Sequence, residues 1–444
     1  MSDVRELLLS LQEDLRGARF DARAVRARGE SRRRHQRALA AALALVLAAA
    51  LLGTMRWVHL ASPPPPTHPV PRGDGRIHVP GSVRALALDT ATHTLYIGNP
   101  GSPGGHEAAA PDGVLVMDIR HCRAEDSSEC TGGSVPMDSF PWDLAPSANG
   151  TLYAATWGRG VQLIDARTCN ATDRSGCGTV ASGPRPGPAA VGVAVDDTAS
   201  TLWVASLDNP PSLDIVGFGA PLPSDHLPTS HLAGYDTRTC NVRDASGCRP
   251  TTSFALNGVV NAMTVDPSSH TLYVVAQTSD GRRTLWAARG NRLTQLADLG
   301  QDPTLDLSAT AGLAVEQRLH TLYVTPAAGS TILVFDTRRC GVAASTCDVV
   351  TRARVGDGPN SIAVDDTTQT VYVLNGGDAT ISALDGRHCD AEVRTSCRST
   401  SALLEPTGQP QSLQPSTLVV DPGNRTLYVA ELAAGLVVPV AAAD

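Results

Sequence analysis

One sequence motif, called the repeated phrase below, recurs seven times in this chain and constrains its fold more than any other feature. Each copy reads as a short apolar strand, a polar turn of about four residues and a second strand rich in β-branched and aromatic residues. Self-similarity at a period of roughly 50–70 residues indicates one supersecondary unit packed against copies of itself. The copies begin at Ala85, Asp143, Gly192, Ala262, Gly312, Ser361 and Thr417.

Each unit continues past these two strands. A third strand, such as the one from Thr331, comes before a cysteine, and a fourth follows a second cysteine, as after Cys347. Four-stranded units repeated seven times predict an all-β fold, a seven-bladed β-propeller. A β-solenoid is the competing repeat architecture, but its repeats are far shorter.

The two ends of the repeat region complement each other. The last unit offers only three strands before the chain ends, whereas the segment at Arg76–Val79 precedes the first unit and resembles a fourth strand. We therefore expect Arg76–Val79 to complete the last blade beside Gly435–Val440. Closing the ring in this way hides two exposed sheet edges.

The ten cysteines fall into five local pairs, each following a strand that ends in Asp. An even number in repeated pairs, in a region expected outside the cytoplasm, indicates disulfides that each pin a polar hairpin. Zinc is the alternative, but its usual ligand spacing is shorter and two pairs would have to converge. The pairs are Cys122–Cys130, Cys169–Cys177, Cys240–Cys248, Cys340–Cys347 and Cys389–Cys397, which leaves the fourth and seventh units without one.

The repeat resembles the YVTN-type β-propeller repeat proteins, including surface-layer-like ones, over residues 76–441. The motif is carried by Leu322–Thr325, by Val371–Asn375 and by their equivalents, each after a turn that begins with Val-Asp in most copies and ends with a Thr. The cysteine hairpins also resemble those of secreted or membrane-anchored actinobacterial members, which implies a high-GC Gram-positive source. Such propellers mostly bind or scaffold. The Asn that ends the motif is present only at Asn99 and Asn375, so a sevenfold ring of Asn is not expected.

An apolar segment precedes the repeats. Ala38 to Met55 is 18 residues without a charge, the length of one transmembrane helix. A cleaved signal peptide is the alternative, but the 37-residue leader is long and no clear Ala-x-Ala site follows. Four arginines lie directly before the helix and only Arg56 directly after it, so the N-terminus is expected in the cytoplasm.

This organisation predicts four parts. Residues 1–37 form a cytoplasmic Arg-rich segment, 38–58 a single-pass signal-anchor helix in the cell membrane, 59–75 a stiff Pro-rich linker, and 76–441 the extracytoplasmic propeller. Apolar residues at helical spacing in the first segment, from Val4 to Leu15, either contact a lipid or partner or belong to a solvated leader that sets topology.

Two connections between second and third strands are long, 99–113 and 206–230. Long loops on a rigid scaffold commonly carry binding, so we expect a contact face for a protein or an envelope glycan here. An insertion packed on its own blade is the alternative. The candidate binding residues are Asn99, Trp157, Asp208, Phe218, Asn375 and Glu431.

Other recurring side chains indicate scaffold. Three histidines, His93, His270 and His320, share one turn position on separate blades, which favours solvated turns over a metal site. The aspartates that begin these turns are expected to accept backbone N–H bonds. Three tryptophans could stack on a sugar, but Trp203 replaces the usual Tyr and is expected in the core, with Trp142 and Trp157 capping the second blade.

The sequence contains no nucleophile elbow, no H-E-x-x-H and no phosphate loop, so we predict no catalytic residue, metal or cofactor. A net charge of −8 argues against nucleic acid. The favoured function is a membrane-anchored binding or scaffold module with a monomeric ectodomain. The alternatives are a lactonase-like or sugar-acid hydrolase with a divalent ion near Asn99, Asn375 and Glu431, and a purely structural envelope protein.

Overall fold

The computed structural model divides the 444-residue chain into two compact units, residues 1–70 and 71–444. The structure describes residues 76–79, 81–99, 113–122, 124, 130–210, 229–278, 280–301, 311–343, 347–394, 397–404, 415–431 and 435–443. The cytoplasmic segment, membrane helix and linker predicted for residues 1–75 lie outside these residues, as does Phe218. Within the described ranges, no helix has the length and apolar character needed to span a bilayer.

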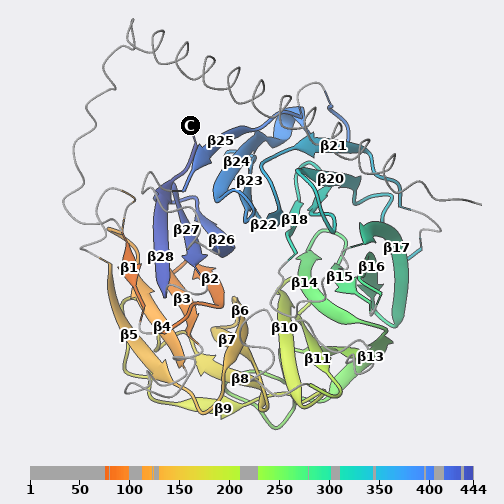
Figure 1. The fold of residues 1–444 in the computed structure, drawn as a ribbon. Coiled ribbons are helices and arrows are strands. Elements are labelled where there is room, and N and C mark those ends of the chain that lie inside the picture. Colours follow the sequence, from red (N-terminus) through yellow and green to blue (C-terminus); the bar gives the residue numbers. More distant parts are fainter. Residues whose placement is uncertain are drawn as a thin grey trace, which may run out of the picture. The chain divides into compact units, whose positions relative to one another are not determined.

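The second unit is a seven-bladed β-propeller, as the repeat predicted: seven four-stranded antiparallel sheets stand around a central channel (Figure 1). Blade one contains β2 (Ala85–Asp89), β3 (Thr94–Asn99), β4 (Gly113–Asp118) and β5 (Thr131–Pro136). Blade two contains β6 (Pro141–Pro146), β7 (Thr151–Thr156), β8 (Gly160–Asp165) and β9 (Val180–Ser182). Blade three contains β10 (Ala189–Asp196), β11 (Thr201–Leu207), β12 (Ser230–Asp236) and β13 (Pro250–Leu256).

The remaining blades repeat this order. Blade four contains β14 (Val259–Asp266), β15 (Thr271–Gln277), β16 (Arg282–Arg289) and β17 (Arg292–Gln301). Blade five contains β18 (Leu313–Glu316), β19 (Thr321–Val324), β20 (Thr331–Asp336) and β21 (Thr351–Arg354). Blade six contains β22 (Pro359–Asp365), β23 (Thr370–Asn375), β24 (Thr380–Asp385), a 3₁₀ turn η1 (Gly386–His388) and β25 (Thr400–Leu403). Blade seven contains β26 (Pro415–Asp421), β27 (Thr426–Glu431), β28 (Leu436–Ala441) and β1 (Ile77–His78).

The chain ends close the ring as the sequence predicted. β1 pairs antiparallel with β28, with Ile77 opposite Val437 and His78 opposite Leu436. The N–H of Val79 adds a 2.7 Å hydrogen bond to the carbonyl of Gly435. The innermost strand of each blade contacts those of both neighbours, and β26 contacts β2. The first and last parts of the propeller sequence therefore share one sheet, and blade seven cannot form without both.

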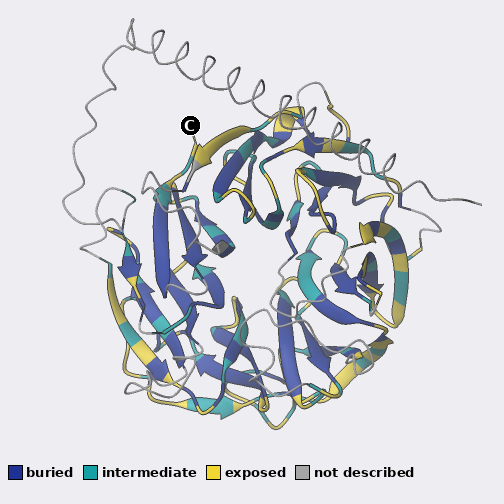
Figure 2. Cartoon of the chain, in the orientation of Figure 1, coloured by how far each residue is buried: buried dark blue, intermediate teal, exposed yellow. Residues whose placement is uncertain are grey.

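Burial follows the radial position of each strand. The second strand of a blade is almost wholly buried, as in β3, β7 and β27, whereas the outermost strands β5 and β13 are mostly exposed (Figure 2). Apolar side chains of neighbouring blades pack together into clusters that follow the ring. The strand carrying the Thr-Leu-Tyr motif is therefore the structural centre of each blade.

All ten cysteines form the five predicted disulfides, and each disulfide closes the hairpin between a third and a fourth strand. Blade four instead joins β16 to β17 through the two residues Gly290 and Asn291, with Arg289 paired to Arg292. Gly290 has a φ of 58°, the left-handed conformation that such tight hairpins need. Blade seven also has no disulfide, because its fourth strand β1 comes from the other end of the propeller sequence and no hairpin joins it to β28.

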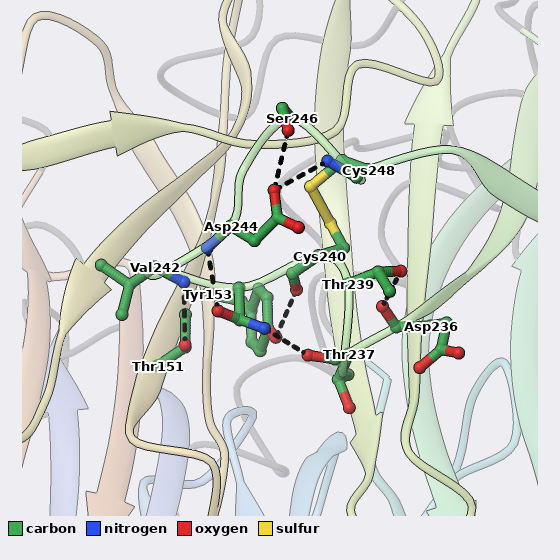
Figure 3. Close-up of a disulfide and its surroundings, with 12 residues drawn as sticks. Thr151, Tyr153, Asp236, Thr237, Thr239, Cys240, Val242, Asp244, Ser246 and Cys248 are labelled. Carbon is green, nitrogen blue, oxygen red and sulfur yellow. Dashed lines mark hydrogen bonds between the residues drawn. A yellow bond between two sulfur atoms is a disulfide. The ribbon is translucent and has the colours of Figure 1, made fainter.

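In six of the seven blades the second strand carries a tyrosine that reaches the next blade. The hydroxyl of Tyr153 donates a 2.8 Å hydrogen bond to the carbonyl of Cys240, the first cysteine of blade three (Figure 3). We call this contact the hydroxyl clamp. It recurs wherever the next blade has a disulfide, between Tyr96 and Cys169, Tyr273 and Cys340, Tyr323 and Cys389, and Tyr428 and Cys122.

The threonine two residues before the tyrosine supports the clamp. The N–H of Val242, two residues after Cys240, donates to Oγ1 of Thr151 at 3.2 Å (Figure 3). The same contact joins Ala171 to Thr94 and Ala391 to Thr321. The regular Thr and Tyr of the repeat are therefore anchors for the neighbouring cysteine hairpin, a scaffold role that the sequence predicted in general but not in its geometry.

The turn residues also have structural roles. Asp89, Asp196, Asp266, Asp365 and Asp421 each accept a backbone N–H from two or three residues further on, as predicted. The residue before the turn Thr has a positive φ in all seven blades, which accounts for the recurring histidines as turn residues. These residues are His93, Gly150, Ser200, His270, His320, Gln369 and Arg425.

Candidate binding site at the channel mouth

The described residues that flank the two long connections lie at the same end of the channel as the start of every innermost strand. In blade one, Ala85 at the start of β2 pairs with Gly98, next to the residue where the long connection from β3 begins. In blade three, Ala189 at the start of β10 pairs with Leu207, beside the base of the second long connection. The opposite end carries the turns and the cysteine hairpins. The end from which the two long connections leave is called the loop face below.

A cavity of about 210 Å³ lies where the innermost strands begin. All seven blades contribute to its wall, mostly with small or apolar residues. Among the described residues that line it, only Arg84 and Asp143 carry a charge. Both come from neighbouring blades, one and two, so the charge of the channel mouth is concentrated on one side.

Arg84 is held by an aromatic group. Its guanidinium carbon lies 4.2 Å from the ring centroid of Trp142, a cation–π contact. The Trp142 ring lies 5.1 Å from that of Trp157 and 5.6 Å from that of Phe140. Only 8% of Arg84 is exposed to solvent. The tryptophan at the cavity therefore serves as a platform for an arginine.

Asp143 is held by the backbone. Its Oδ1 accepts the N–H of Leu144 at 2.9 Å, and its Oδ2 accepts the N–H of Val193 in blade three at 3.0 Å. Burial raises the pKa of this carboxyl to about 6, although the two N–H donors and the charge of Arg84 act in the opposite direction. A carboxyl with this pKa in a channel is a candidate for a functional group.

The other side of the cavity carries neutral polar groups. Asn261 of blade four, Asn360 and Ser361 of blade six and Ser416 of blade seven are among the residues that line it. Amides and hydroxyls can both donate and accept hydrogen bonds, so this wall suits the uncharged polar part of a ligand. The cavity thus has a charged aromatic side and a neutral polar side.

Three of the sequence candidates, Asn99, Asn375 and Glu431, end the second strands of blades one, six and seven and are buried there. The Nδ2 of Asn375 donates to the carbonyl and Oγ1 of Thr380 and to Oγ of Ser382, which indicates a role within its own blade. A ligand or metal role for the three residues stays a prediction.

Trp157 and Asp208 are placed differently. Trp157 is 9% exposed and packs in the core between blades two and three, behind Trp142. Asp208 lies at the base of the second long loop, where it accepts the hydroxyl of Thr229 at 2.7 Å and lies 3.2 Å from Nδ1 of His231. It therefore closes the loop base. Trp203 packs in the core, as predicted.

No group of three or more His, Cys, Asp or Glu suited to a metal ion occurs in the described part of the chain. Like His231 and His388, His270 lies beside an aspartate: its Nδ1 is 2.9 Å from Oδ2 of Asp196 in blade three. This contact joins two blades on the turn face, away from the cavity.

Sequence reasoning missed Arg84 and Asp143, although the seven copies contain a signal. Asp143 is the one charged residue at the first position of the repeated phrase, and Arg84 is the one charged residue just before it. The other copies have small, apolar or neutral polar residues at both positions. Comparing the copies column by column would have singled out both residues.

Comparison with known proteins supports the propeller fold and shows no family. No protein-family model matches the chain, and no curated protein matches it. A chain from a structure described as "Crystal Structure of Mitotic Checkpoint Complex" is similar, with a TM-score of 0.51 and 11% sequence identity. The likeness covers 87% of this chain and 99% of that chain. At this identity it establishes the propeller fold alone, so the resemblance to YVTN-type repeats stays a prediction.

Proposed function

We propose that this chain is an extracytoplasmic binding module that presents its loop face and channel mouth to a protein or glycan partner. The observation that carries the proposal is the placement of Arg84 and Asp143. They are the only charged groups among the described residues of the cavity wall, and they lie together at the end of the channel where the two long connections leave.

The compartment is supported by the cysteines. Five disulfides that use every cysteine of the chain suggest an oxidising environment outside the cytoplasm. The uncharged stretch at residues 38–55 supports a single membrane anchor before the propeller. Propellers are commonly protein-binding scaffolds, and the rigid ring is suited to holding variable loops in place.

Proximity labelling with the full-length chain in its host membrane tests the binding face. Arg84→Ala and a variant with residues 211–228 replaced by a short Gly-Ser linker should each lose labelled partners. Arg167→Ala is the matched control, because Arg167 pairs with Asp165 on the turn face. If neither loop-face variant changes the labelling pattern, or the control removes the same partners, the assigned face is wrong.

The anchor is tested separately. The full-length chain should stay in the membrane fraction after alkaline carbonate washing, whereas a variant whose residues 38–58 are replaced by a secretory signal with a cleavage site should be released. Release of the unmodified chain by the wash would remove the anchor from the proposal and leave the binding face unaffected.

A further inference from the structure

We propose that the cavity at the channel mouth receives a carboxylate group, with Arg84 as its charge partner and Asp143 as the internal competitor for that arginine. This inference rests on the proposed binding function and names the chemistry of the ligand. Nothing in the fold alone requires a charged pair here, since five of the seven blades build the same wall from uncharged residues.

Arg84 is oriented before a ligand arrives. With its guanidinium carbon 4.2 Å from the Trp142 centroid, the guanidinium lies against the indole, and the aromatic contacts of Trp142 with Trp157 and Phe140 hold that platform. A guanidinium stacked on a ring keeps its N–H groups at its edge, where their fork matches the two oxygens of a carboxylate. Little side-chain entropy is then lost on binding.

The charge balance favours a single negative group. The cavity wall carries one arginine and one aspartate, so Arg84 would repel a cation, and Asp143 would repel a dianion such as phosphate more strongly than a monocarboxylate. A monocarboxylate needs only one positive partner. The volume of about 210 Å³ suits one small acid or one acidic side chain. Asn261 and Asn360 can hold the neutral part of the ligand.

Asp143 makes the affinity depend on pH. Its pKa of about 6 means that it is charged at neutral pH, where it competes with a ligand for Arg84, and largely neutral one unit below that value. Ligand carboxylates with a pKa of about 4 stay charged in between. β2 and β10 both pack against β6. The carboxylates on these two strands, Asp89 and Asp196, lie at the far ends of the strands, on the turn face, and therefore away from Asp143. Affinity should therefore rise as pH falls from about 7.5 to about 5.

Calorimetric titration of the full-length chain, purified without reductant, tests this chemistry. The probes are D-glucuronate and a short acetylated peptide with one Glu, with D-glucose and the matching Gln peptide as neutral controls. We expect an acidic probe to bind several-fold tighter at about pH 5 than at about pH 7.5. Binding of glucuronate alone identifies a small acid as the source, and binding of the Glu peptide alone identifies a protein side chain; both results support the proposal.

Two variants separate the roles of the charges. Arg84→Gln should weaken the acidic probe at least tenfold, the loss of about 1.5 kcal/mol or more for a charged hydrogen bond. Asp143→Asn keeps Arg84 and should bind at about pH 7.5 as the unmodified chain does at about pH 5, which protects the test if Arg84→Gln folds poorly. Arg338→Gln is the control, because Arg338 pairs with Asp336 and Glu392 on the turn face.

The proposal is overturned if neither acidic probe binds, if neutral probes bind as tightly, or if Arg338→Gln weakens binding as much as Arg84→Gln. Affinity that rises with pH would also overturn it. If the acidic probes fail while proximity labelling still depends on the loop face, the carboxylate chemistry is wrong and the binding function stands. If labelling also fails, both are wrong.

Discussion

Blade three is held differently on its two sides. Towards blade two, Tyr153 and Thr151 bind the cysteine hairpin of blade three through a hydroxyl clamp and a backbone N–H. Towards blade four, Trp203 takes the place of the tyrosine. Its ring stacks on Phe254 of its own blade, with centroids 6.4 Å apart, and belongs to an apolar cluster that includes Leu272 and Val274 of blade four. Blade four has no disulfide hairpin, so no cysteine carbonyl is present for a hydroxyl to bind.

The difference shows that the tyrosine of one blade and the disulfide hairpin of the next blade act together as one interblade contact. Every disulfide contributes the carbonyl of its first cysteine to a clamp, and the one second strand without a tyrosine faces a blade without a disulfide. At the remaining interface, Tyr372 reaches the carbonyl of Ala443 at 3.4 Å near the end of the chain. Burial raises the pKa of these tyrosines, so their hydroxyls stay protonated donors at ordinary pH.

Removing all five disulfides should have the largest effect. Each closes a loop of about nine residues, worth about 2.5 kcal/mol in the chain-entropy view, so full reduction should cost about 12 kcal/mol. That is comparable with the whole stability of a typical domain. Circular dichroism of the chain with and without reductant should show loss of the propeller. A reduced chain with unchanged thermal unfolding would contradict a stabilising role for the hairpins.

The second-largest effect is expected when the interface between blades three and four is given the tyrosine of the other blades. Trp203→Tyr restores the repeat but buries a hydroxyl without a cysteine carbonyl to accept it and removes apolar volume, so we expect a loss of about 2–3 kcal/mol. Urea unfolding measures it. Trp203→Phe is the control that removes volume without adding a hydroxyl. A stabilised Trp203→Tyr chain would mean that tyrosine and disulfide are independent features.

Breaking one clamp should cost less. Tyr153→Phe leaves the Cys240 carbonyl without its hydroxyl donor and should destabilise the fold by about 1–2 kcal/mol. Tyr372→Phe is the matched variant, because its hydrogen bond is longer and ends at the chain terminus, and it should cost below about 1 kcal/mol. Equal losses in the two variants, by the same urea measurement, would show that the cysteine acceptor has no special role.

The smallest effect concerns the contact between Asp196 of blade three and His270 of blade four. Burial alone would raise the pKa of Asp196, but hydrogen bonds from Thr198, the N–H of Ala199 and His270 outweigh it and lower the pKa. The ionised carboxyl therefore stabilises the fold above its unfolded pKa of about 4, and this contribution is lost as pH falls through the lower folded value. Asp196→Asn should flatten the acid limb of stability against pH, measured by thermal unfolding. An unchanged acid limb would exclude this contribution.

Much of the fold is readable from the sequence because its interactions are local or repeated. The hairpins, the cysteine pairs and the Asx turns each involve residues close in the chain, so spacing alone identifies them. Ring closure was also predictable, although β1 and β28 are far apart, because a missing strand at one end matched a spare strand at the other. The long loops were found from length alone, and Asp208 at the base of one proved to close it.

Most contacts between different blades could not be read from the sequence. Tyr153 and Cys240 are 87 residues apart, and nothing in the sequence around either residue shows that the tyrosine hydroxyl donates a hydrogen bond to the cysteine carbonyl. Arg84, Trp142 and Asp143 likewise meet only because the ring places the starts of β2 and β6 side by side. The number of blades, the five disulfides and the ring closure could be read from the sequence, because they depend on the period of the repeat and the spacing of its residues. Only the closed ring decided which irregular residues share the channel mouth, because that depends on which blades become neighbours and on the register of their innermost strands.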